Sequence, residues 1–330
     1  MSLAQKARSR IAMDITVILC TYNRCDSLVR ALESVNASIV DQRITWEILV
    51  VDNNSSDQTR QRIEEFCHRY PARFRYLFEP QPGKSYALNS GIREAHGRVL
   101  AFMDDDVTTE TTWLHNLTKP LLSGKWVGAG GRILPDESFV PPVWLSREGK
   151  MGRYSLAPLA LFDLGMQAGR LQEPPFGTNM AFQKELFGKY GGFRTDLGPR
   201  PESDIRSEDT EFGSRVLAGG EPLYYEPAAV VHHGVSKTRL QKNYFLSWWF
   251  DKGKTNIRES GTSSPITCWG VPLYLFRRLV VWTVLWMVAT DPGKRFGCKI
   301  RVWGKFGEIV ESHRLSAMRK FSRRGSDVKS

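Results

Sequence analysis

Cysteine is scarce in this sequence of 330 residues, and its five cysteines do not form the pairs that metal sites or disulfide frameworks use. Their number is odd, and no two of them are separated by only two residues, the usual spacing of ligands at a structural zinc site. Cys20 and Cys25 lie close together, but no matching pair follows them. We therefore expect neither structural zinc nor disulfides, and a protein that works in a reducing compartment.

The sequence also lacks a long uninterrupted apolar run. Its first ten residues are polar and contain no apolar core of a secretion signal, so we expect the chain to stay in the cytoplasm. The most apolar window, residues 271–290, is interrupted by Arg277 and Arg278, whereas spanning a bilayer takes about 20 apolar residues. We expect a helix that lies in the membrane interface, with Trp282 and Trp286 at headgroup depth. A buried helix that closes a domain and a dimer contact are the alternatives.

Acidic residues are sparse in the last part of the chain. Residues 236–330 carry 19 of the 46 Lys and Arg residues but only 6 of the 35 Asp and Glu residues, a net charge of +13. The total is +11, so the first 235 residues carry a net charge of −2. This basic tail flanks an apolar segment rather than forming a module with spaced aromatic residues, which argues against nucleic acid as its partner. We expect the tail to meet an anionic membrane surface.

Two common phosphate-binding motifs are missing. Residues 81–85 end like a P-loop, but the glycine required five positions before Gly83 is replaced by Phe78. No GxGxxG follows the first apolar segment, so a dinucleotide-binding fingerprint is also absent. Gly83 is expected instead to form a tight turn into a helix from which Lys84 and Asn89 reach a ligand.

The pattern that is present is an alternation of strands and helices, in a chain whose 41% hydrophobic content supports a sizeable core. Short apolar runs predict strands, and apolar residues at helical spacing predict helices between them. The predicted strands are residues 15–20, 46–51, 74–78 and 98–103, and the predicted helices are residues 26–38, 57–70 and 85–95. This order predicts an α/β fold, a mostly parallel sheet flanked by helices. Ligands of such sheets gather at the carboxyl ends of the strands.

The pattern is weaker in the second half of the chain. Residues 134–175 are rich in Pro, Gly and aromatic side chains, and we expect an irregular, partly mobile segment over the site. Residues 176–182 predict a turn and a short strand, and residues 228–232 another short strand. Between them, residues 208–217 predict a helix that Ser207 caps.

Three consecutive carboxylates are the first candidates for chemistry. Asp104, Asp105 and Asp106 follow directly on the apolar residues 99–103, at the expected carboxyl end of a buried strand. Like charges at this spacing raise one another's pKa unless a divalent metal or a ligand hydroxyl takes up their lone pairs. The alternative is a solvated loop whose acids cap the next helix.

Two further polar pairs occur far along the chain. Glu208 and Asp209 open a predicted helix, and His232 and His233 follow a predicted strand. Carboxylates and imidazoles at strand and helix ends can hold a metal ion and supply a free base. The alternatives are acids that stabilise a helix dipole, and ordinary surface or core histidines.

Taken in order, these motifs resemble the family 2 glycosyltransferases, an inverting class with the GT-A fold. The resemblance covers residues 13–235. No single motif is decisive, whereas the ordered set is specific. The matching segments are residues 17–24, 50–57, 83–91, 102–106, 177–182, 191–193, 207–211 and 232–234.

The resemblance implies a role for each matching residue. Asp209 corresponds to the catalytic base, with Glu208 beside it to position a sugar. Asp104 meets the ribose, and Asp105 is either a bystander or orients its neighbours. The residues expected around the donor nucleotide are Thr21, Tyr22, Asn23, Arg24, Asp52, Lys84, Asn89, Asp104 and Asp105.

The metal site implied by the resemblance uses Asp106 and one of the two histidines. The spacing to Val235 favours His233 over His232. The implied cofactor is Mn²⁺ or Mg²⁺, and the implied donor is a nucleotide sugar. We expect a UDP-sugar because UDP is the commonest carrier in this class.

The expected protein has two parts. Residues 1–235 form a GT-A catalytic domain, with a nucleotide-binding half at about 13–107 and an acceptor half at about 108–235. Residues 236–330 form a basic, helical, amphipathic and membrane-associating region. The expected acceptor is a glycan or a lipid-linked molecule in polysaccharide or glycolipid biosynthesis, and the expected location is the inner face of the cell membrane. The alternatives are an inactive sugar-nucleotide-binding scaffold and a basic nucleic-acid-binding protein.

Two groups of residues are candidates for weaker roles. The first could stack on acceptor sugars or belong to the core, and we prefer the core for most of them. Its members are Trp144, Phe162, Phe176, Trp248, Trp249 and Phe250. The second is Arg239, which we consider as a further cation for the diphosphate.

Overall fold

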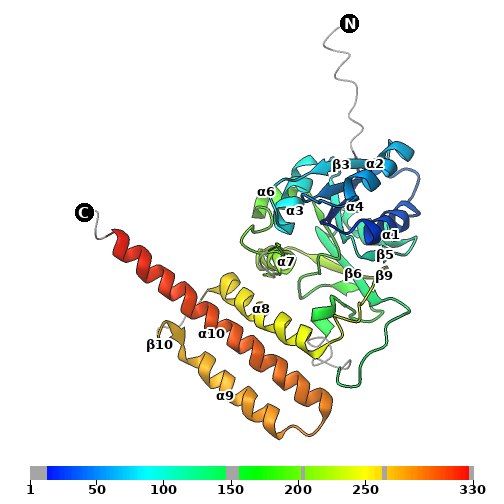
Figure 1. The fold of residues 1–330 in the computed structure, drawn as a ribbon. Coiled ribbons are helices and arrows are strands. Elements are labelled where there is room, and N and C mark those ends of the chain that lie inside the picture. The colour runs from blue at the N-terminus through cyan, green and yellow to red at the C-terminus, as the bar shows by residue number, and fades with distance from the viewer. Residues whose placement is uncertain (1–12, 146–155, 202–204, 262–265, 327–330) are drawn as a thin grey trace. The chain divides into compact units, whose positions relative to one another are not determined.

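Residues 13–145, 156–201, 205–261 and 266–326 are described by a computed structural model of the protein (Figure 1). Two units divide the chain. Unit 1 takes its residues from 1–138, 160–201 and 207–234, and unit 2 takes its residues from 139–159, 202–206 and 235–330.

A nine-stranded sheet runs through unit 1, in the order β3-β2-β1-β4-β8-β6-β9-β5 with β7 paired to β9. Six strands (β1 to β4, β6 and β9) run in one direction, and β5, β7 and β8 run against them. The strands are β1 (Ile15–Thr21), β2 (Trp46–Asp52), β3 (Phe74–Phe78), β4 (Val99–Asp104), β5 (Val107–Thr109), β6 (Gly128–Pro135), β7 (Gly169–Arg170), β8 (Asn179–Gln183) and β9 (Leu223–His233).

Helices flank this sheet. They are α1 (Cys25–Asn36), α2 (Thr59–Arg69), α3 (Lys84–Glu94), α4 (Trp113–Leu122), α6 (Glu185–Tyr190) and α7 (Glu208–Ala218). In α1 the buried residues Leu28, Ala31, Leu32 and Val35 recur at the spacing of one helix face. Every residue of β2 is buried, which is the burial expected of a parallel strand covered on both faces. The predicted α/β fold is thereby confirmed.

The second half of unit 1 departs from the sequence expectation in detail. The short strand predicted at 228–232 is the end of the longer strand β9, and helices α4 and α6 and strands β5 and β7 were not predicted. In the segment 134–175, which was expected to be irregular, β7 and the one-turn helix η2 (Ala157–Leu159) are described, and residues 146–155 lie outside the described residues. Short strands of two or three residues carry too few side chains to show a period.

Unit 2 is mainly helical. Its elements after η2 are α8 (Lys242–Ser260), β10 (Thr267–Cys268), β11 (Val271–Pro272), α9 (Leu273–Val288) and α10 (Pro292–Ser326). Within this unit α10 lies between α8 and α9 (Figure 1). Ile257 of α8, Val271 of β11 and Leu275 of α9 form a buried cluster, and Ile309 and Leu315 of α10 pack against it.

Glycines let α8 and α10 approach closely. A methyl group on Gly307 would overlap the carbonyl oxygen of Phe250, and one on Gly253 would overlap the carbonyl oxygen of Gly304. The two backbones therefore approach each other closely at these glycines.

The apolar window of the sequence forms α9, and its tryptophans do not point where they were expected. Trp286 lies against Trp303 of α10, with ring centroids 6.2 Å apart, and the guanidinium of Arg301 lies over the ring of Trp282. Both tryptophans therefore face α10 and not outward, which corrects the expectation that they lie at headgroup depth. Among the described residues, no helix combines the length and apolarity needed to cross a bilayer.

Candidate functional site

Polar residues of unit 1 meet at the carboxyl ends of three neighbouring parallel strands. In the register of the sheet Thr21 of β1 lies opposite Asp52 of β2, and Cys20 lies opposite Asp104 of β4. Asp105 and Asp106 follow in the turn between β4 and β5. These residues therefore converge on one edge of the sheet, at the strand ends where ligands of such folds gather.

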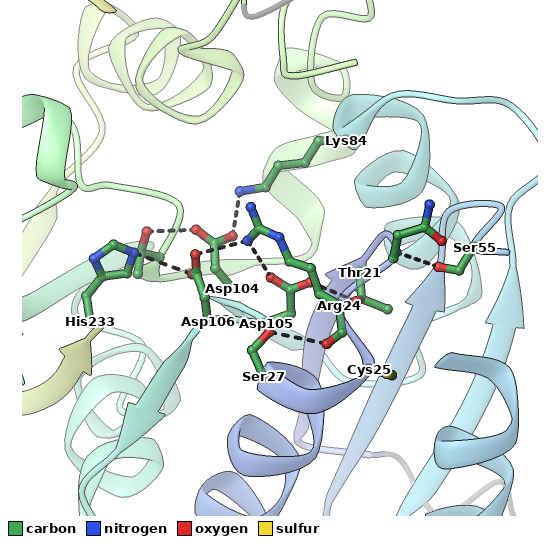
Figure 2. A network of polar contacts seen from close by, with 12 residues as sticks. Thr21, Arg24, Cys25, Ser27, Ser55, Lys84, Asp104, Asp105, Asp106 and His233 are labelled. Carbon is green, nitrogen blue, oxygen red and sulfur yellow. Dashed lines mark hydrogen bonds and ion pairs between the residues drawn. The ribbon is translucent and has the colours of Figure 1, made fainter. Parts of the chain in front are cut away.

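Asp104 is held by two side chains from other elements. Lys84, the first residue of α3, places its Nζ 2.5 Å from Oδ1 of Asp104, and Thr178 donates its hydroxyl to Oδ2 at 2.8 Å. Burial lowers the pKa of Lys84, but the carboxylates of Asp104 and Glu208 outweigh it and raise the pKa above its usual value. Lys84 therefore remains a cation between two acidic side chains, and Figure 2 shows its contact with Asp104.

Asp105 is the most enclosed of the three aspartates. It accepts hydrogen bonds from the hydroxyl of Thr21 at 2.7 Å and from Nη1 of Arg24 at 3.1 Å. Burial raises the pKa of Asp105 to about 6, in spite of the opposing effect of Arg24. Because its oxygens face the protein, Asp105 orients Thr21 and Arg24 rather than presenting a free carboxylate.

Arg24 also reaches the third aspartate. The same Nη1 atom lies 3.0 Å from Oδ2 of Asp106, so one guanidinium nitrogen bridges Asp105 and Asp106 (Figure 2). The Arg24 side chain is 47% exposed, whereas that of Asp105 is 7% exposed. Arg24 can therefore move away from the carboxylates at little steric cost.

His233 lies beside Asp106, and strand pairing places it there. Val107, the residue after Asp106, is the register partner of His233 in the β5–β9 ladder. Nε2 of the buried His233 is 3.5 Å from Oδ1 of Asp106. Since side chains alternate along a strand, His232 points elsewhere, with Nε2 3.4 Å from a carboxylate oxygen of Glu110.

The donor set of Asp106 and His233 fits a divalent cation. Neighbouring ligands of an octahedral ion with bonds of about 2.1 Å are about 3 Å apart, close to the separation of these two atoms. Among the described residues, no group of three His, Cys, Asp or Glu side chains forms a complete metal site. The remaining ligands of an ion would then come from water or from a bound phosphate.

Asp209 is fixed at the first turn of α7 by backbone donors. Its Oδ2 accepts from the N–H of Gly177 at 2.6 Å, and its Oδ1 accepts from the N–H of Thr210 at 2.7 Å. A side chain at Gly177 would crowd the carboxylate of Asp209, so the close approach needs glycine. Ser207 is the N-cap residue with φ 78°, but it makes no side-chain capping bond, so the expected Ser207 cap is wrong.

Glu208 lies next to Asp209 but faces the interior. Its side chain is buried, and a carboxylate oxygen lies 3.8 Å from Nζ of Lys84. Burial raises the pKa of Glu208 above its usual range, and the neighbouring charge of Asp209 adds to this effect. Lys84 thus connects Glu208 with Asp104.

The remaining predicted nucleotide residues line the ends of β1 and β2. The carboxylate of Asp52 is buried and accepts from the N–H of Ser55 at 2.9 Å and from the hydroxyl of Tyr76 at 3.1 Å. Asn23 adopts a left-handed backbone, with φ 51°, and its amide oxygen accepts from the N–H of Ser56. Tyr22, beside it, is 43% exposed and available to a ligand.

Asn89 has a different position from the one expected. Its amide nitrogen donates to the carbonyl of Phe193 at 2.8 Å, and its amide oxygen accepts from the N–H of the same residue at 2.8 Å. This double contact ties α3 to the loop after α6. The amide of Asn89 is therefore used within the protein, which corrects the expectation that it reaches a ligand.

Two functional contacts were not foreseen from the sequence. Thr178 binds Asp104, and Gly177 binds Asp209, so adjacent residues before β8 link two parts of the site. Both residues belong to the matching segment 177–182, in which the sequence indicates no individual roles for them. Their partners lie 74 and 32 residues away, and no local pattern reveals such contacts.

The weaker candidates divide between the two units. Phe162 and Phe176 of unit 1 pack on each other at 5.1 Å. In unit 2 Trp144 packs on Phe245 at 5.1 Å, and Trp248 on Trp249 at 4.9 Å. These contacts agree with the preference for core packing. Arg239 belongs to unit 2.

Comparisons with known proteins agree with this geometry. At 24% identity over 249 residues, the chain is similar to a glucosyl-dolichyl phosphate glucuronosyltransferase of Haloferax volcanii, covering 72% of this chain and 75% of that protein. It is also similar to the succinoglycan biosynthesis protein ExoM of Rhizobium meliloti, at 26% identity over 262 residues, covering 74% and 75% of the two chains.

A solved structure shares the fold. It is the mannosyltransferase PcManGT from Pyrobaculum calidifontis in complex with GDP-Man and Mn²⁺, with a TM-score of 0.54 and 17% identity over 98% of this chain and 84% of that one.

The profile described as "Glycosyl transferase family 2" matches residues 16–191, more than half of the chain. This match spans β1 to α6 and includes the three aspartates and the Gly177–Thr178 pair. The protein is therefore an enzyme that belongs to the family 2 glycosyltransferases.

Proposed function

We propose that this enzyme transfers a sugar, with inversion, from a nucleoside-diphosphate donor to a glycan or a lipid-linked acceptor. The observation that carries the proposal is the gathering of two cations beside acidic side chains, Arg24 at Asp105 and Asp106 and Lys84 at Asp104 and Glu208, with Asp209 held separately by backbone N–H groups. It combines cations for a diphosphate, carboxylates for a metal ion and a separate carboxylate for the acceptor.

The donor side of the proposed site lies at the ends of β1, β2 and β4. Asp52 and the 21–23 segment are assigned to the base and Asp104 to the ribose. Lys84 and Arg24 carry positive charge beside the carboxylates, as binding of a diphosphate requires. We expect UDP as the carrier, although the structural relative described above holds GDP-mannose.

The residues assigned to a divalent cation, Mn²⁺ or Mg²⁺, are Asp106 and His233. The 3.5 Å between their atoms supports this pair over any pair with His232, which lies beside Glu110. When bound, such an ion neutralises the charge that grows on the departing diphosphate. The same task falls in part to Lys84, since its ammonium group lies at Asp104.

The acceptor side centres on Asp209. An acceptor hydroxyl is a weak nucleophile, and a carboxylate that takes its proton during attack accelerates transfer by about 10² to 10⁴. The backbone N–H groups of Gly177 and Thr210 fix the orientation of this carboxylate and leave it further lone pairs. One displacement at the anomeric carbon inverts its configuration, and only one free carboxylate is needed.

We assign the nucleotide half to residues 13–107 and the acceptor half to residues 108–235, followed by the basic region 236–330. A lipid-linked acceptor is supported by the name of the Haloferax relative, which acts on a dolichyl phosphate derivative. We therefore place the reaction at the inner face of the cell membrane, in polysaccharide or glycolipid synthesis.

The proposal is tested by calorimetry with UDP, GDP and dTDP, each with and without Mn²⁺. We expect one nucleotide to bind, and its affinity to fall at least tenfold when Mn²⁺ is removed with a chelator. Asp106→Ala should remove the metal dependence, whereas Glu110→Ala, next to His232, should retain it. Binding of no nucleotide would refute the donor site, and binding without transfer to any acceptor would favour the scaffold alternative.

A further inference from the structure

One side of α9 is apolar and exposed. Val280, Val281, Val284, Leu285 and Val288 have exposed fractions between 41% and 66%. These positions recur every three or four residues, so they form one stripe along the helix. Exposed apolar side chains that gather in a stripe mark an interaction surface, whereas isolated ones do not.

The opposite side of α9 is already used. Leu275 is fully buried, and Trp282 and Trp286 face α10, where Arg301 and Lys299 lie over their rings. Figure 1 shows α9 alongside α10, on the side away from α8. The apolar stripe is therefore the side of α9 that is turned away from the helices of its own unit.

Positive charge continues this stripe toward the start of the helix. Arg277 precedes Val281 by four residues and Arg278 precedes Leu285 by seven, so both lie on the exposed side. Both are exposed, and the guanidinium of Arg278 lies 5.2 Å from the ring centre of Tyr274. No acidic residue occurs between Trp269 and Thr290.

We infer that this stripe, together with Arg277 and Arg278, is a docking surface for an anionic lipid bilayer. With 16 residues the helix is about 24 Å long, which suits a position within the interface, parallel to the membrane. The valines and Leu285 enter the boundary of the acyl chains, and the two arginines meet lipid phosphates. This inference names the surface that would hold the enzyme at the membrane and rests on the membrane location proposed above. Its test requires no sugar transfer.

Charge distinguishes this partner from a second copy of the chain. A copy of the same surface offers no carboxylate to Arg277 and Arg278, because the whole segment 269–290 lacks acidic residues. An anionic leaflet offers lipid phosphates to the two arginines and acyl chains to the apolar stripe on the same side of α9.

The test is flotation of the full chain with vesicles of equimolar phosphatidylcholine and phosphatidylglycerol, compared with vesicles of phosphatidylcholine alone. We expect binding to the anionic vesicles and much weaker binding to the neutral ones. Val284→Asp/Val288→Asp should abolish flotation. Arg277→Gln/Arg278→Gln should weaken it about 30-fold, the factor for two cations at about 1 kcal/mol each.

Matched variants control for polarity and net charge. Val143→Asp changes a valine of unit 2 that is 96% exposed and lies outside α9, and Arg30→Gln/Arg69→Gln removes two exposed charges from unit 1. Neither should change flotation. Nucleotide binding should persist in all variants, so failure of docking and failure of the transferase proposal remain distinguishable.

Three outcomes would overturn the inference. The first is no flotation by the unaltered chain. The second is flotation that the α9 variants leave unchanged. The third is a dimer in solution, without flotation, that Val284→Asp/Val288→Asp dissociates, which would assign the stripe to a second copy.

Discussion

Asp209 differs from the other acidic side chains of the site in its hydrogen bonds. Both of its oxygens accept from backbone N–H groups, whereas Asp104, Asp105 and Glu208 face cationic side chains. An amide in place of this carboxylate would turn an N–H donor toward Gly177 or Thr210 and would have no base for the acceptor proton.

We therefore predict that Asp209→Asn lowers the turnover rate by about 10² to 10⁴ and leaves donor binding nearly unchanged. Turnover and calorimetric nucleotide affinity would be measured on the same preparation. Glu211→Gln, which removes a carboxylate two residues further along α7, serves as the control. Full transfer by Asp209→Asn would contradict the assignment of the base.

Nη1 of Arg24 lies 3.0 Å from Oδ2 of Asp106. A metal ion at Asp106 would repel it, and a diphosphate would give it a new partner. We predict that Arg24→Ala binds Mn²⁺ alone up to about 5-fold more tightly, the range of a partly exposed ion pair, yet binds the nucleoside diphosphate more weakly. Spin-resonance titration of Mn²⁺ measures the first effect, with Arg30→Ala as the control. An unchanged or weaker Mn²⁺ affinity would exclude this competition.

The sequence predicts the acidic side chains of the site better than their partners. Asp104 to Asp106 are recognisable because they follow a continuous apolar strand, and His233 because it ends another. The pairing of Thr178 with Asp104 depends on how β8 adds to β4, and no local period encodes that. Asn89 was misjudged because an amide suits a backbone clasp as well as a ligand.

At the scale of elements, the close crossing of α8 and α10 depends on individual glycines. Gly307→Ala would press a methyl group onto the carbonyl oxygen of Phe250. We predict that it lowers the free energy of unfolding of unit 2 by about 1 to 3 kcal/mol. Denaturant unfolding followed by tryptophan fluorescence measures this change.

A matched substitution lies one turn away on the same helix. A methyl group on Gly304 would lie 3.5 Å from the nearest atom, the carbonyl oxygen of Trp249, which is an ordinary contact. Gly304→Ala should therefore be neutral or stabilise α10 by up to about 1 kcal/mol, since alanine favours helix. Equal destabilisation by both substitutions would show that helix propensity, and not the close crossing, is being measured.

Elements whose apolar residues recur at a regular spacing were predictable from the sequence. Elements that depend on pairing or packing with distant parts of the chain were not. The repeat of Leu28, Ala31, Leu32 and Val35 predicts α1 to within a few residues. The long strand β9 was reduced to its last apolar residues because Glu226 and Pro227 interrupt the run, although pairing with β6 continues on both sides of them. The side of α9 that faces α10 depends on cation–π contacts with Arg301 and Lys299, which sequence periodicity does not show.

At the scale of the whole molecule, each unit has its own buried core, so thermal unfolding should occur in separate transitions. We predict that Mn²⁺ with the preferred nucleotide stabilises only unit 1, by about 2.7 kcal/mol at a hundredfold excess over Kd. The midpoint temperature of its transition should rise accordingly. Gly307→Ala should lower only the midpoint temperature of the transition of unit 2. Scanning calorimetry measures both, and a single transition that both changes move would contradict independent unfolding.

The overall fold was predictable from its first hundred residues, where strands and helices alternate. The parallel strands β1 to β4 require helical connections, and those connections are visible in the sequence. The antiparallel strands β5, β7 and β8 were not recognised as such, because direction is decided by pairing across long stretches of chain.

The register of β5 on β9 also determines how the chain tolerates changes in length. Gly131 pairs with Glu226 and the next residue, Arg132, pairs with Val230, so residues 227–229 form a bulge that can absorb an insertion. An insertion between Val230 and the two histidines would instead shift every later residue to the other face of the sheet. His232 would then replace His233 beside Asp106, and Mn²⁺ affinity would report the exchange. An insertion of one residue is therefore tolerated within the bulge, whereas beyond the bulge it exchanges the two histidines.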